Sequence, residues 1–421
     1  MNEFLTLVSR QVATDARTLP GLVRARFSED RVERCGTVGE LRAAARRCVP
    51  RVMFDFVDGA ADDEVTSRRN REDFAEYEIV PRMLVDVSEV DIRTTVLGQP
   101  VAVPLIGAPM GLNGLVHHRG EAGIARAMHA AGSIHTLAAM ASYSIEEIAA
   151  EAPGSEWFQM YIWRDRGLVR ELVERARAAG FLALVLTVDV PRAAGRDRDR
   201  RNGFGLPPRV TLRSLAGGAV RPRWSAQFIR HPRMTTASIA GHGGGPDDPV
   251  GITAYVNGQF DPSANWDDLA WFRELWDGPL VVKGILSASD ARRAVALGSD
   301  GVIVSNHGGR QLDHAPSTIS ALPPIVDAIG SDAEVILDGG IRRGSDVLKA
   351  IALGARACMI GRPLAYGLGA GGEPGARRAV AILEQELRTA MALAGRPSLA
   401  AVDRSLVAAR AGSARVPEPA P

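Results

Sequence analysis

Eight short apolar segments recur along the chain, and most are followed by a stretch rich in Ala, Glu and Arg with helical periodicity. This alternation is typical of a parallel sheet whose strands are connected by helices, and eight such strands close a (β/α)8 barrel. The 421 residues are enough, because a barrel of this kind occupies about 250 residues as one domain. The expected strands are 103–108, 134–139, 157–162, 181–189, 280–285, 301–306, 334–339 and 357–362.

The predicted fold class is therefore α/β, a (β/α)8 TIM barrel with an N-terminal helical extension and a long insertion after the fourth strand. Residues 1–100 look mainly helical and are expected to cap one end of the barrel, which spans residues 101–400. The insertion, about 196–266, is rich in Gly, Pro, Arg and aromatic residues and cannot build its own core. We interpret it as a lid or partner-binding loop, or else as a solvated surface excursion. Residues 401–421 form a C-terminal tail, with a disordered end expected at 414–421.

Composition excludes several classes of function. The chain has 50 basic and 49 acidic residues and a net charge of +1, which argues against a nucleic-acid-binding protein. Its cysteines, Cys35, Cys48 and Cys358, are too few and too scattered for a disulfide framework or a zinc site, so no metal is expected. The longest apolar run is far shorter than the ~18 residues of a membrane span, and the first residues lack a signal-peptide pattern. We therefore expect a cytoplasmic protein.

Six of the expected strands end in side chains that can form hydrogen bonds or carry a charge. In this barrel the carboxyl ends of the strands meet at one rim, where the fold carries out its chemistry. One active site at that rim explains all of these residues at once. They are Gln159 and Tyr161, Thr187 and Asp189, Lys283, Ser305, Asn306 and His307, Asp338, and Gly361 and Arg362.

The loops after the last two expected strands carry an anion-binding pattern. The segments DGGIRRG (338–344) and IGRP (360–363) offer small residues that let backbone amides approach an anion, and arginines that pair with it. These loops are the usual phosphate site of the barrel, so we predict that a phosphate group binds there.

Lys283 is one of only two lysines, with Lys349, in a chain whose other basic residues are arginines. A position that keeps lysine under such a bias is expected to need its ammonium group. Lys283 ends a strand, so it could form a Schiff base with a substrate, or it could stabilise negative charge on a bound cofactor. The residues alone leave both roles open.

His307 is the candidate general base. Arg310, three residues later, is a candidate for binding a substrate carboxylate. Asp189 could hold the tautomer of the imidazole and stabilise its protonated form. It could instead pair with one of the arginines close by, Arg192 or Arg196.

At these residues the sequence resembles the FMN-dependent family that oxidises 2-hydroxy acids, which includes glycolate oxidase, L-lactate dehydrogenase and mandelate dehydrogenase. The most specific piece is SNHGGRQLD (305–313). The segments FQMY (158–161), LTVDVPR (186–192), VKGI (282–285) and LDGGIRRGSDVLKA (337–350) are similar in order and spacing. The resemblance covers roughly residues 40 to 400.

This resemblance implies that FMN lies across the barrel mouth. Its phosphate would contact the loops that hold Gly340, Arg342, Gly361 and Arg362, and Lys283 would face the pyrimidine edge of the flavin, where its charge stabilises the reduced ring. The other implied FMN contacts are Pro109, Met110, Gly111, Gln159, Thr187, Ser305 and Asp338.

The resemblance also implies the chemistry. His307, oriented by Asp189, would accept the 2-hydroxyl proton as hydride passes to the flavin, or the α-proton if a carbanion forms. Arg310 would bind the substrate carboxylate, with Tyr161 near the hydroxyl and Arg196 at the edge of the site. The implied substrate is a lactate- or mandelate-like L-2-hydroxy acid, or a larger one. The electrons would pass to oxygen, a quinone or a redox protein, and the implied assembly is a homotetramer.

Three positions depart from the pattern of that family. Phe56 stands where the family usually has a carboxylate-binding tyrosine, which removes a hydrogen bond worth about 1.5–3 kcal/mol and favours a larger, more apolar substrate. Ala138 replaces a residue whose hydroxyl often contacts the flavin. Gly111 replaces the alanine common in oxidases and is expected to leave space beside the flavin.

Two alternative functions remain open. A flavoenzyme of the same fold could act on a carrier-bound or peptide-derived 2-hydroxy acid, with the 196–266 insertion contacting the carrier or the surface of a membrane. A Lys283 Schiff-base lyase acting on a phosphorylated substrate would keep the phosphate site without redox chemistry.

Overall fold

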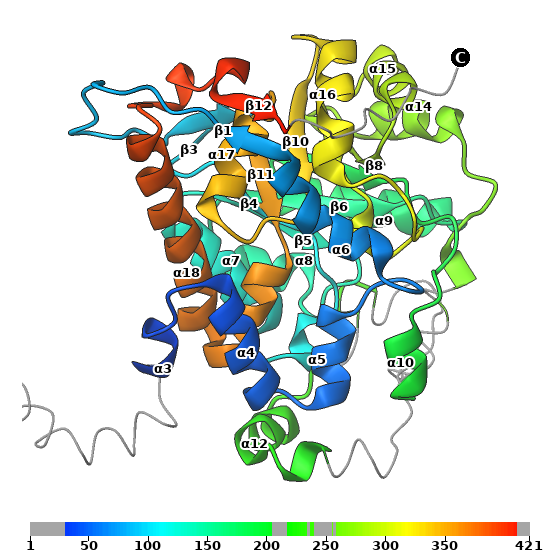
Figure 1. Ribbon diagram of the computed structural model, residues 1–421. Coiled ribbons are helices and arrows are strands. Elements are labelled where there is room, and N and C mark those ends of the chain that lie inside the picture. The colour runs from blue at the N-terminus through cyan, green and yellow to red at the C-terminus, as the bar shows by residue number, and fades with distance from the viewer. Residues whose placement is uncertain (1–29, 204–216, 234–235, 240–254, 256–257, 411–421) are drawn as a thin grey trace, which may run out of the picture.

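The computed structural model describes residues 30–203, 217–233, 236–239, 255 and 258–410 (Figure 1). Its centre is a closed barrel of eight parallel strands, hydrogen-bonded in the order β10-β11-β4-β5-β6-β7-β8-β9. Each strand overlaps a segment expected from the sequence, so the predicted (β/α)8 barrel is confirmed. The strands are β4 (Leu105–Gly107), β5 (Ile134–Ala138), β6 (Glu156–Tyr161), β7 (Ala183–Thr187), β8 (Leu280–Ile285), β9 (Gly301–Val304), β10 (Glu334–Asp338) and β11 (Ala357–Ile360).

Helices connect these strands around the outside of the barrel (Figure 1). Two of them begin with a capping box, in which Ser144 and Asn265 accept hydrogen bonds from the first turn while Glu147 and Asp268 accept one in return from the cap backbone. The helices are α7 (Gly120–Ala130), α8 (Ile145–Glu151), α9 (Arg166–Ala178), α14 (Trp266–Leu275), α15 (Ala288–Ala296), α16 (Thr318–Ile329), α17 (Gly344–Ala352) and α18 (Arg362–Leu393).

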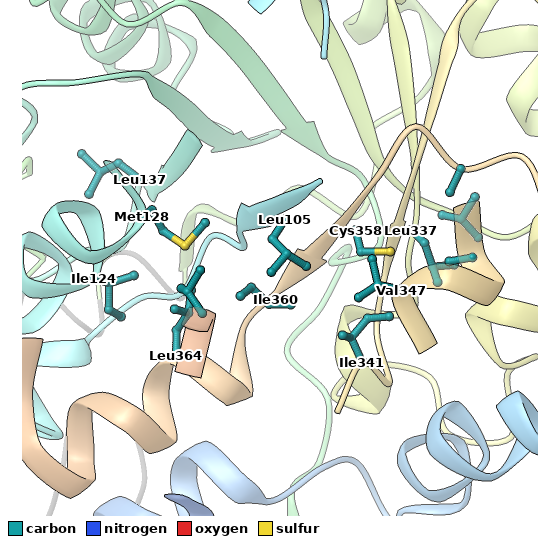
Figure 2. Packing of buried hydrophobic residues seen from close by; sticks show 14 of the residues in the cluster. Leu105, Ile124, Met128, Leu137, Leu337, Ile341, Val347, Cys358, Ile360 and Leu364 are labelled. Carbon is teal, nitrogen blue, oxygen red and sulfur yellow. The ribbon is translucent and has the colours of Figure 1, made fainter. Parts of the chain in front are cut away.

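The barrel strands are buried on both faces. Side chains such as Ile106 and Val185 belong to the cluster that fills the barrel interior. Their neighbours in sequence point outward, and Figure 2 shows Leu105 and Ile360 packed among side chains of the surrounding helices, such as Met128. Burial on both faces explains why these strands appear in the sequence as continuous apolar runs rather than as alternating ones.

The N-terminal region is less helical than expected. Its described helices are α3 (Asp30–Glu33), α4 (Val38–Cys48), α5 (Arg51–Asp58) and α6 (Val65–Glu72). Three short strands then follow, β1 (Tyr77–Ile79), β2 (Thr94–Val96) and β3 (Gln99–Val101). Strands of three residues are too short for a periodic pattern, which is why the sequence does not indicate them.

The β2–β3 hairpin closes the amino end of the barrel. Its turn residues, Leu97 and Gly98, both have positive φ, as a tight two-residue turn requires. Val96 and Val101 pack with the interior cluster, and the backbone N–H of Leu97 donates to Glu334 at the start of β10. The expected cap over one end of the barrel is therefore largely this hairpin.

The C-terminal residues also differ from the expectation. Within the segment 401–421, assigned from sequence to a tail, strand β12 (Val407–Ala409) pairs antiparallel with β1. The end expected to be disordered, 414–421, lies outside the described residues.

The long insertion lies between β7 and α14, and its described helices are α10 (Asp197–Arg201) and α12 (Pro222–Arg230). Arg198 of α10 pairs with Asp58 of α5 over 2.8 Å, and Trp224 of α12 donates to the carbonyl of Leu115 over 3.1 Å. Both helices therefore pack against segments at the carboxyl end of the barrel, as Figure 1 also shows for α10, α12 and α5. Among the described helices, none is long and apolar enough to cross a bilayer.

Candidate active site

A cavity opens at the carboxyl end of the barrel, between the strand ends, α5 and the loop after β7. Most of the residues predicted from sequence line it, which places them within one site. Four others are not among the lining residues: Gln159, Thr187 and Ser305 are buried, and Asp189 is half-buried. The predicted residues on the wall are Phe56, Pro109, Met110, Gly111, Tyr161, Lys283, Arg196, His307, Arg310, Asp338, Gly340, Arg342, Gly361 and Arg362.

His307 and Asp189 form a hydrogen-bonded pair. Nδ1 of His307 lies 3.0 Å from Oδ1 of Asp189, which leaves Nε2 as the second nitrogen available to a ligand in the cavity. Burial by itself raises the pKa of Asp189, but the imidazole of His307 and the ammonium of Lys283 more than offset it, so the pKa lies below its ordinary value. Of the three partners left open for Asp189, which were His307, Arg192 and Arg196, the structure places His307 beside it, whereas Arg196 pairs with Asp199 over 3.1 Å.

The backbone at His307 is strained. His307 has φ of 57°, and Gly308 and Gly309 continue the left-handed conformation with φ of 66° and 75°. A residue with a side chain held in such a region costs of order 1–3 kcal/mol, and it persists only where its surroundings fix it. The Oγ of Ser305 accepts the backbone N–H of His307 over 3.0 Å and is one of these fixing contacts.

A buried polar network crosses the floor of the cavity. The ammonium of Lys283 lies 3.0 Å from both Ser305 Oγ and Asp338 Oδ2, and Ser305 donates to Asp338 over 2.7 Å. Burial by itself lowers the pKa of Lys283, but the carboxylates of Asp338 and Asp189 more than offset it, so the pKa is raised and the ammonium stays charged. Beside this network, Gln159 donates to Thr187 over 2.9 Å, and its buried Oε1 has no hydrogen-bond partner among the described residues.

Two arginines bind the carboxyl end of α5. Arg310 donates to the carbonyls of Phe56 and Gly59, and Arg362 donates to those of Val57, Gly59 and Gly308. The carbonyls of Phe56, Val57 and Gly59 lie at the carboxyl end of α5, where a helix leaves its last carbonyls without internal partners. Gly308 belongs to the segment after β9. The side chain of Arg362 is therefore engaged with α5 rather than with the glycine-rich loops.

The ring of Phe56 lies close to two cations. The guanidinium carbons of Arg196 and Arg310 lie 5.4 and 5.3 Å from its centroid. Burial, reinforced by the charges of Arg196 and Arg362, lowers the pKa of Arg310 well below its ordinary value. An anion bound between these arginines would relieve their mutual repulsion.

The two glycine-rich loops lie along another side of the cavity. Gly340 has φ of 84°, and a Cβ at this position would overlap the backbone carbonyl of Asn70, so a larger residue does not fit. Arg342 is half-buried, donates to the carbonyl of Ile341 and lies 5.8 Å from the ring centroid of Tyr366.

Several cavity residues were missed by the sequence analysis. Met140, Val190, Ala193, Ala194 and Phe260 are apolar and carry no motif that distinguishes them from core residues. Gln311 lies inside the motif SNHGGRQLD and could have been found from it; it donates to the carbonyls of Asp189 and Arg192.

Gly111 lines the cavity, and its lack of a side chain has a second reason besides the one expected. A Cβ at this position would lie 2.7 Å from the backbone oxygen of Met140, so an alanine would require the backbone to shift. The space expected beside the flavin stays a prediction.

The fold and the site together define a (β/α)8-barrel enzyme with its chemistry at the carboxyl end of the strands. In the described part of the chain, no group of three or more His, Cys, Asp or Glu residues is arranged to hold a metal ion. The comparisons with known proteins then name the family. The model of the FMN-dependent dehydrogenases matches residues 45–409. The chain belongs to this family, which confirms the resemblance seen in the sequence, and its cofactor is FMN.

Relatives and solved structures agree with this assignment. The chain is 44% identical to an L-lactate oxidase of Nostoc sp. over 372 residues, which is 87% of this chain and 96% of the relative. It is 42% identical to glycolate oxidase 5 of Oryza sativa subsp. japonica over 370 residues, 88% of this chain and 95% of the relative. A crystal structure of the monotopic membrane protein (S)-mandelate dehydrogenase matches with a TM-score of 0.85 and 36% identity, covering 90% of this chain and all of that one.

The residues present fit FMN. The unpartnered Oε1 of Gln159 and the buried ammonium of Lys283 are polar groups suited to the edge of a flavin ring. Gly339, Gly340 and Gly361 of the glycine-rich loops line the same cavity, where the lack of side chains lets a phosphate approach the backbone.

Proposed function

We propose that the chain oxidises an L-2-hydroxy acid with a large apolar side chain to the 2-oxo acid. The observation that carries this proposal is the His307–Asp189 pair beside a cavity that also holds Arg310 and the charged Lys283. The cavity thus combines a base, an arginine that can bind a carboxylate and a cation that stabilises negative charge. The lactate, glycolate and mandelate enzymes among the relatives support the same substrate class.

In the proposed mechanism, Arg310 binds the substrate carboxylate and Arg196 closes over it from the edge of the site. His307 removes a proton through Nε2, either from the 2-hydroxyl or from the α-carbon, and Asp189 stabilises the imidazolium that results. Tyr161 lines the cavity, and in this mechanism it lies near the substrate hydroxyl. FMN, when bound, accepts the two electrons of the oxidation, and we assign it to Gln159, Thr187, Lys283 and the glycine-rich loops.

Apolar residues line the part of the cavity proposed to hold the substrate side chain. Phe260 packs edge-on against Tyr161 with ring centroids 5.3 Å apart, and Met140 and Val190 lie on the same cavity wall. Phe56 contributes a ring where a hydroxyl would otherwise favour small acids. These contacts favour an aryl or long alkyl side chain over the methyl group of lactate.

The test of this proposal is an anaerobic absorbance titration of the purified holoenzyme with glycolate, lactate, mandelate and long-chain 2-hydroxy acids. We expect the flavin absorbance to bleach, most readily with the bulky acids. Subsequent admission of oxygen, or of a quinone, identifies the electron acceptor. A flavin spectrum that none of these acids bleaches would contradict the proposal and favour the carrier-bound or peptide-derived substrate.

The geometry disfavours the Schiff-base lyase. A nucleophilic lysine must lose its proton, but the ammonium of Lys283 is held charged by Asp338 and Asp189 and donates to Ser305. Borohydride treatment in the presence of substrate is therefore expected to leave activity unchanged.

Replacing Phe56 with Tyr is expected to lower the KM for lactate by about tenfold, because the new hydroxyl can donate to the substrate carboxylate. The kcat should change little, and the KM for bulky acids should change less than that for lactate. Steady-state kinetics with both acids check this. Phe56→Leu, which adds no hydroxyl, is the matched control, and an equal fall in KM for that variant would contradict the argument.

We propose that the chain forms a homotetramer and that the loop after β1 lies in an interface between subunits. Met83 and Leu84 are 71% and 106% exposed, and Leu84 is held with positive φ, so the loop presents apolar side chains directly to solvent. Leu84→Asp is expected to shift the mass found by light scattering toward the monomer. The exposed Leu312→Asp, in another loop, is the control, and a monomeric wild type would overturn the proposal.

The surface of α12 supports a peripheral contact with a membrane or a carrier. Ile229 and, just before the helix, Val220 are exposed, and Arg221, Arg223 and Arg230 add positive charge around them. Such a combination is suited to an anionic lipid surface. Cosedimentation with phosphatidylserine vesicles is expected to fall for Ile229→Asp. If the wild type bound neutral vesicles equally well, the proposed contact with an anionic lipid surface would be wrong.

A further inference from the structure

Asn70 lies in α6, outside the barrel, and is only 2% exposed. It has no place in the mechanism above, and no sequence motif pointed to it. Its side chain nevertheless reaches Asn306, the residue immediately before the proposed base His307.

The two amides form a reciprocal pair. Nδ2 of Asn70 donates to Oδ1 of Asn306, and Nδ2 of Asn306 donates back to Oδ1 of Asn70, both over 2.8 Å. Oδ1 of Asn70 also accepts the backbone N–H of Thr318 at the start of α16, over 3.2 Å. These contacts fix the orientation of both amide groups, because a flipped amide would face donor to donor and acceptor to acceptor.

Asn306 in turn shapes the loop that carries His307. Its Oδ1 accepts the backbone N–H of Gly309 over 3.0 Å, which closes the left-handed run from His307 to Gly309. Its Nδ2 also donates to the carbonyl of Pro316 over 2.9 Å. A non-glycine residue with positive φ holds that conformation only where several contacts over-determine it, and Asn306 supplies one of them.

Helix α6 also abuts the backbone of both loops at the cavity. A Cβ on Gly309 would lie 2.6 Å from the backbone nitrogen of Ser67, and a Cβ on Gly340 would overlap the backbone carbonyl of Asn70. Helix α6 is therefore seated against the His307 loop and against a glycine-rich loop at the same time.

We propose that Asn70 is a positioning residue that, through Asn306, holds His307 in its strained, active conformation. This inference rests on the proposed function, in which His307 is the base. It means that the N-terminal region contributes to the catalytic geometry and does more than cover the barrel.

Two variants test this inference in the holoenzyme. Asn70→Leu removes all of the polar contacts at similar volume. Asn70→Asp keeps the shape but cannot donate to Asn306. For both, we expect the rate of flavin reduction at saturating substrate to fall by about 10- to 100-fold, since a small misplacement of a catalytic group has effects of this size. The exposed Arg68→Ala, on the same helix, is the matched control and is expected to behave as wild type.

Other readouts separate positioning from general damage. FMN affinity and sulfite affinity should stay within about threefold of wild type, because neither depends on His307. Asn306→Leu alone should lower the rate at least as much as Asn70→Leu, because it also removes the bonds to Gly309 and Pro316. The double variant should lose less than the product of the two single effects, because both variants break the same pair of amides. A crystal structure of Asn70→Leu should show residues 306–309 displaced from the left-handed conformation.

A failure of the Asn70 inference can be distinguished from a failure of the proposed function. If no 2-hydroxy acid reduces the wild-type flavin, the proposed function fails, and the crystal structure of Asn70→Leu still tests whether this residue holds the loop. If the wild type is reduced and Asn70→Leu matches Arg68→Ala in reduction rate and in loop conformation, the inference is overturned. Parallel losses of FMN binding, sulfite affinity and reduction would also overturn it, since they indicate a merely structural role.

Discussion

Replacing His307 with Ala is expected to lower the rate of flavin reduction by substrate by about 10²- to 10⁴-fold, the usual contribution of a general base. The imidazole is the group beside the cavity that can take a substrate proton while Asp189 stabilises the charge that follows. Anaerobic stopped-flow absorbance measures this rate directly. Bound FMN should remain, because the groups that we assign to its phosphate and ring lie elsewhere in the cavity.

His314 provides the control for this prediction. It also has positive φ and lies in the same loop after β9, but it is exposed. In His314→Ala, the substrate should therefore reduce the flavin at the wild-type rate. If the flavin absorbance of His307→Ala bleached at the wild-type rate, His307 would not be the base. The central step of the proposed mechanism would then be wrong.

Replacing Lys283 with Met is expected to weaken flavin reduction on the order of 10²-fold, the size of effect seen when one charge-stabilising donor is removed from an active site. The affinity for sulfite should fall as well, because its addition to the flavin also places negative charge on the ring. The ammonium is buried and held charged by Asp338 and Asp189, so it can stabilise that charge without reorganising. Stopped-flow reduction and a sulfite titration check the two effects.

Lys349 is a matched control within the same chain. It is the other lysine, and its ammonium donates to the carbonyl of Phe74 over 2.9 Å, joining α17 to the N-terminal region. Lys349→Met is expected to lower the free energy of unfolding while leaving sulfite affinity unchanged. If Lys283→Met retained its sulfite affinity, the placement of Lys283 at the flavin would be wrong.

The bias toward arginine directed attention to the two lysines of the chain but could not assign their roles. Both ammonium groups have defined hydrogen-bond partners in the structure, and the need for an ammonium at each position stays a prediction. The bias could not distinguish a lysine at the cavity from one that joins two helices. That distinction depends on which strand end or helix face carries the residue and on what packs against it.

The barrel could be predicted from the sequence, because each strand is an apolar run that can be recognised within a few residues. The sequence also determined which residues meet at the rim, since the carboxyl ends of parallel strands must lie together. The glycine-rich loops and the His307 motif are local as well, and so they could be identified before any contact was known.

Most contacts between segments distant in sequence became known only from the folded chain. The residues alone left the partner of Asp189 open, although the family resemblance implied His307, and the structure shows that pair. It also pairs Arg196 with Asp199 and directs the side chain of Arg362 to the end of α5. It also brought Phe260 and Met140 to the cavity, and Asn70 to Asn306. The physical reason is that a side chain such as Asp189 or Asn70 can satisfy its hydrogen bonds with several partners equally well. Only the packing of the whole chain selects which partner lies within reach.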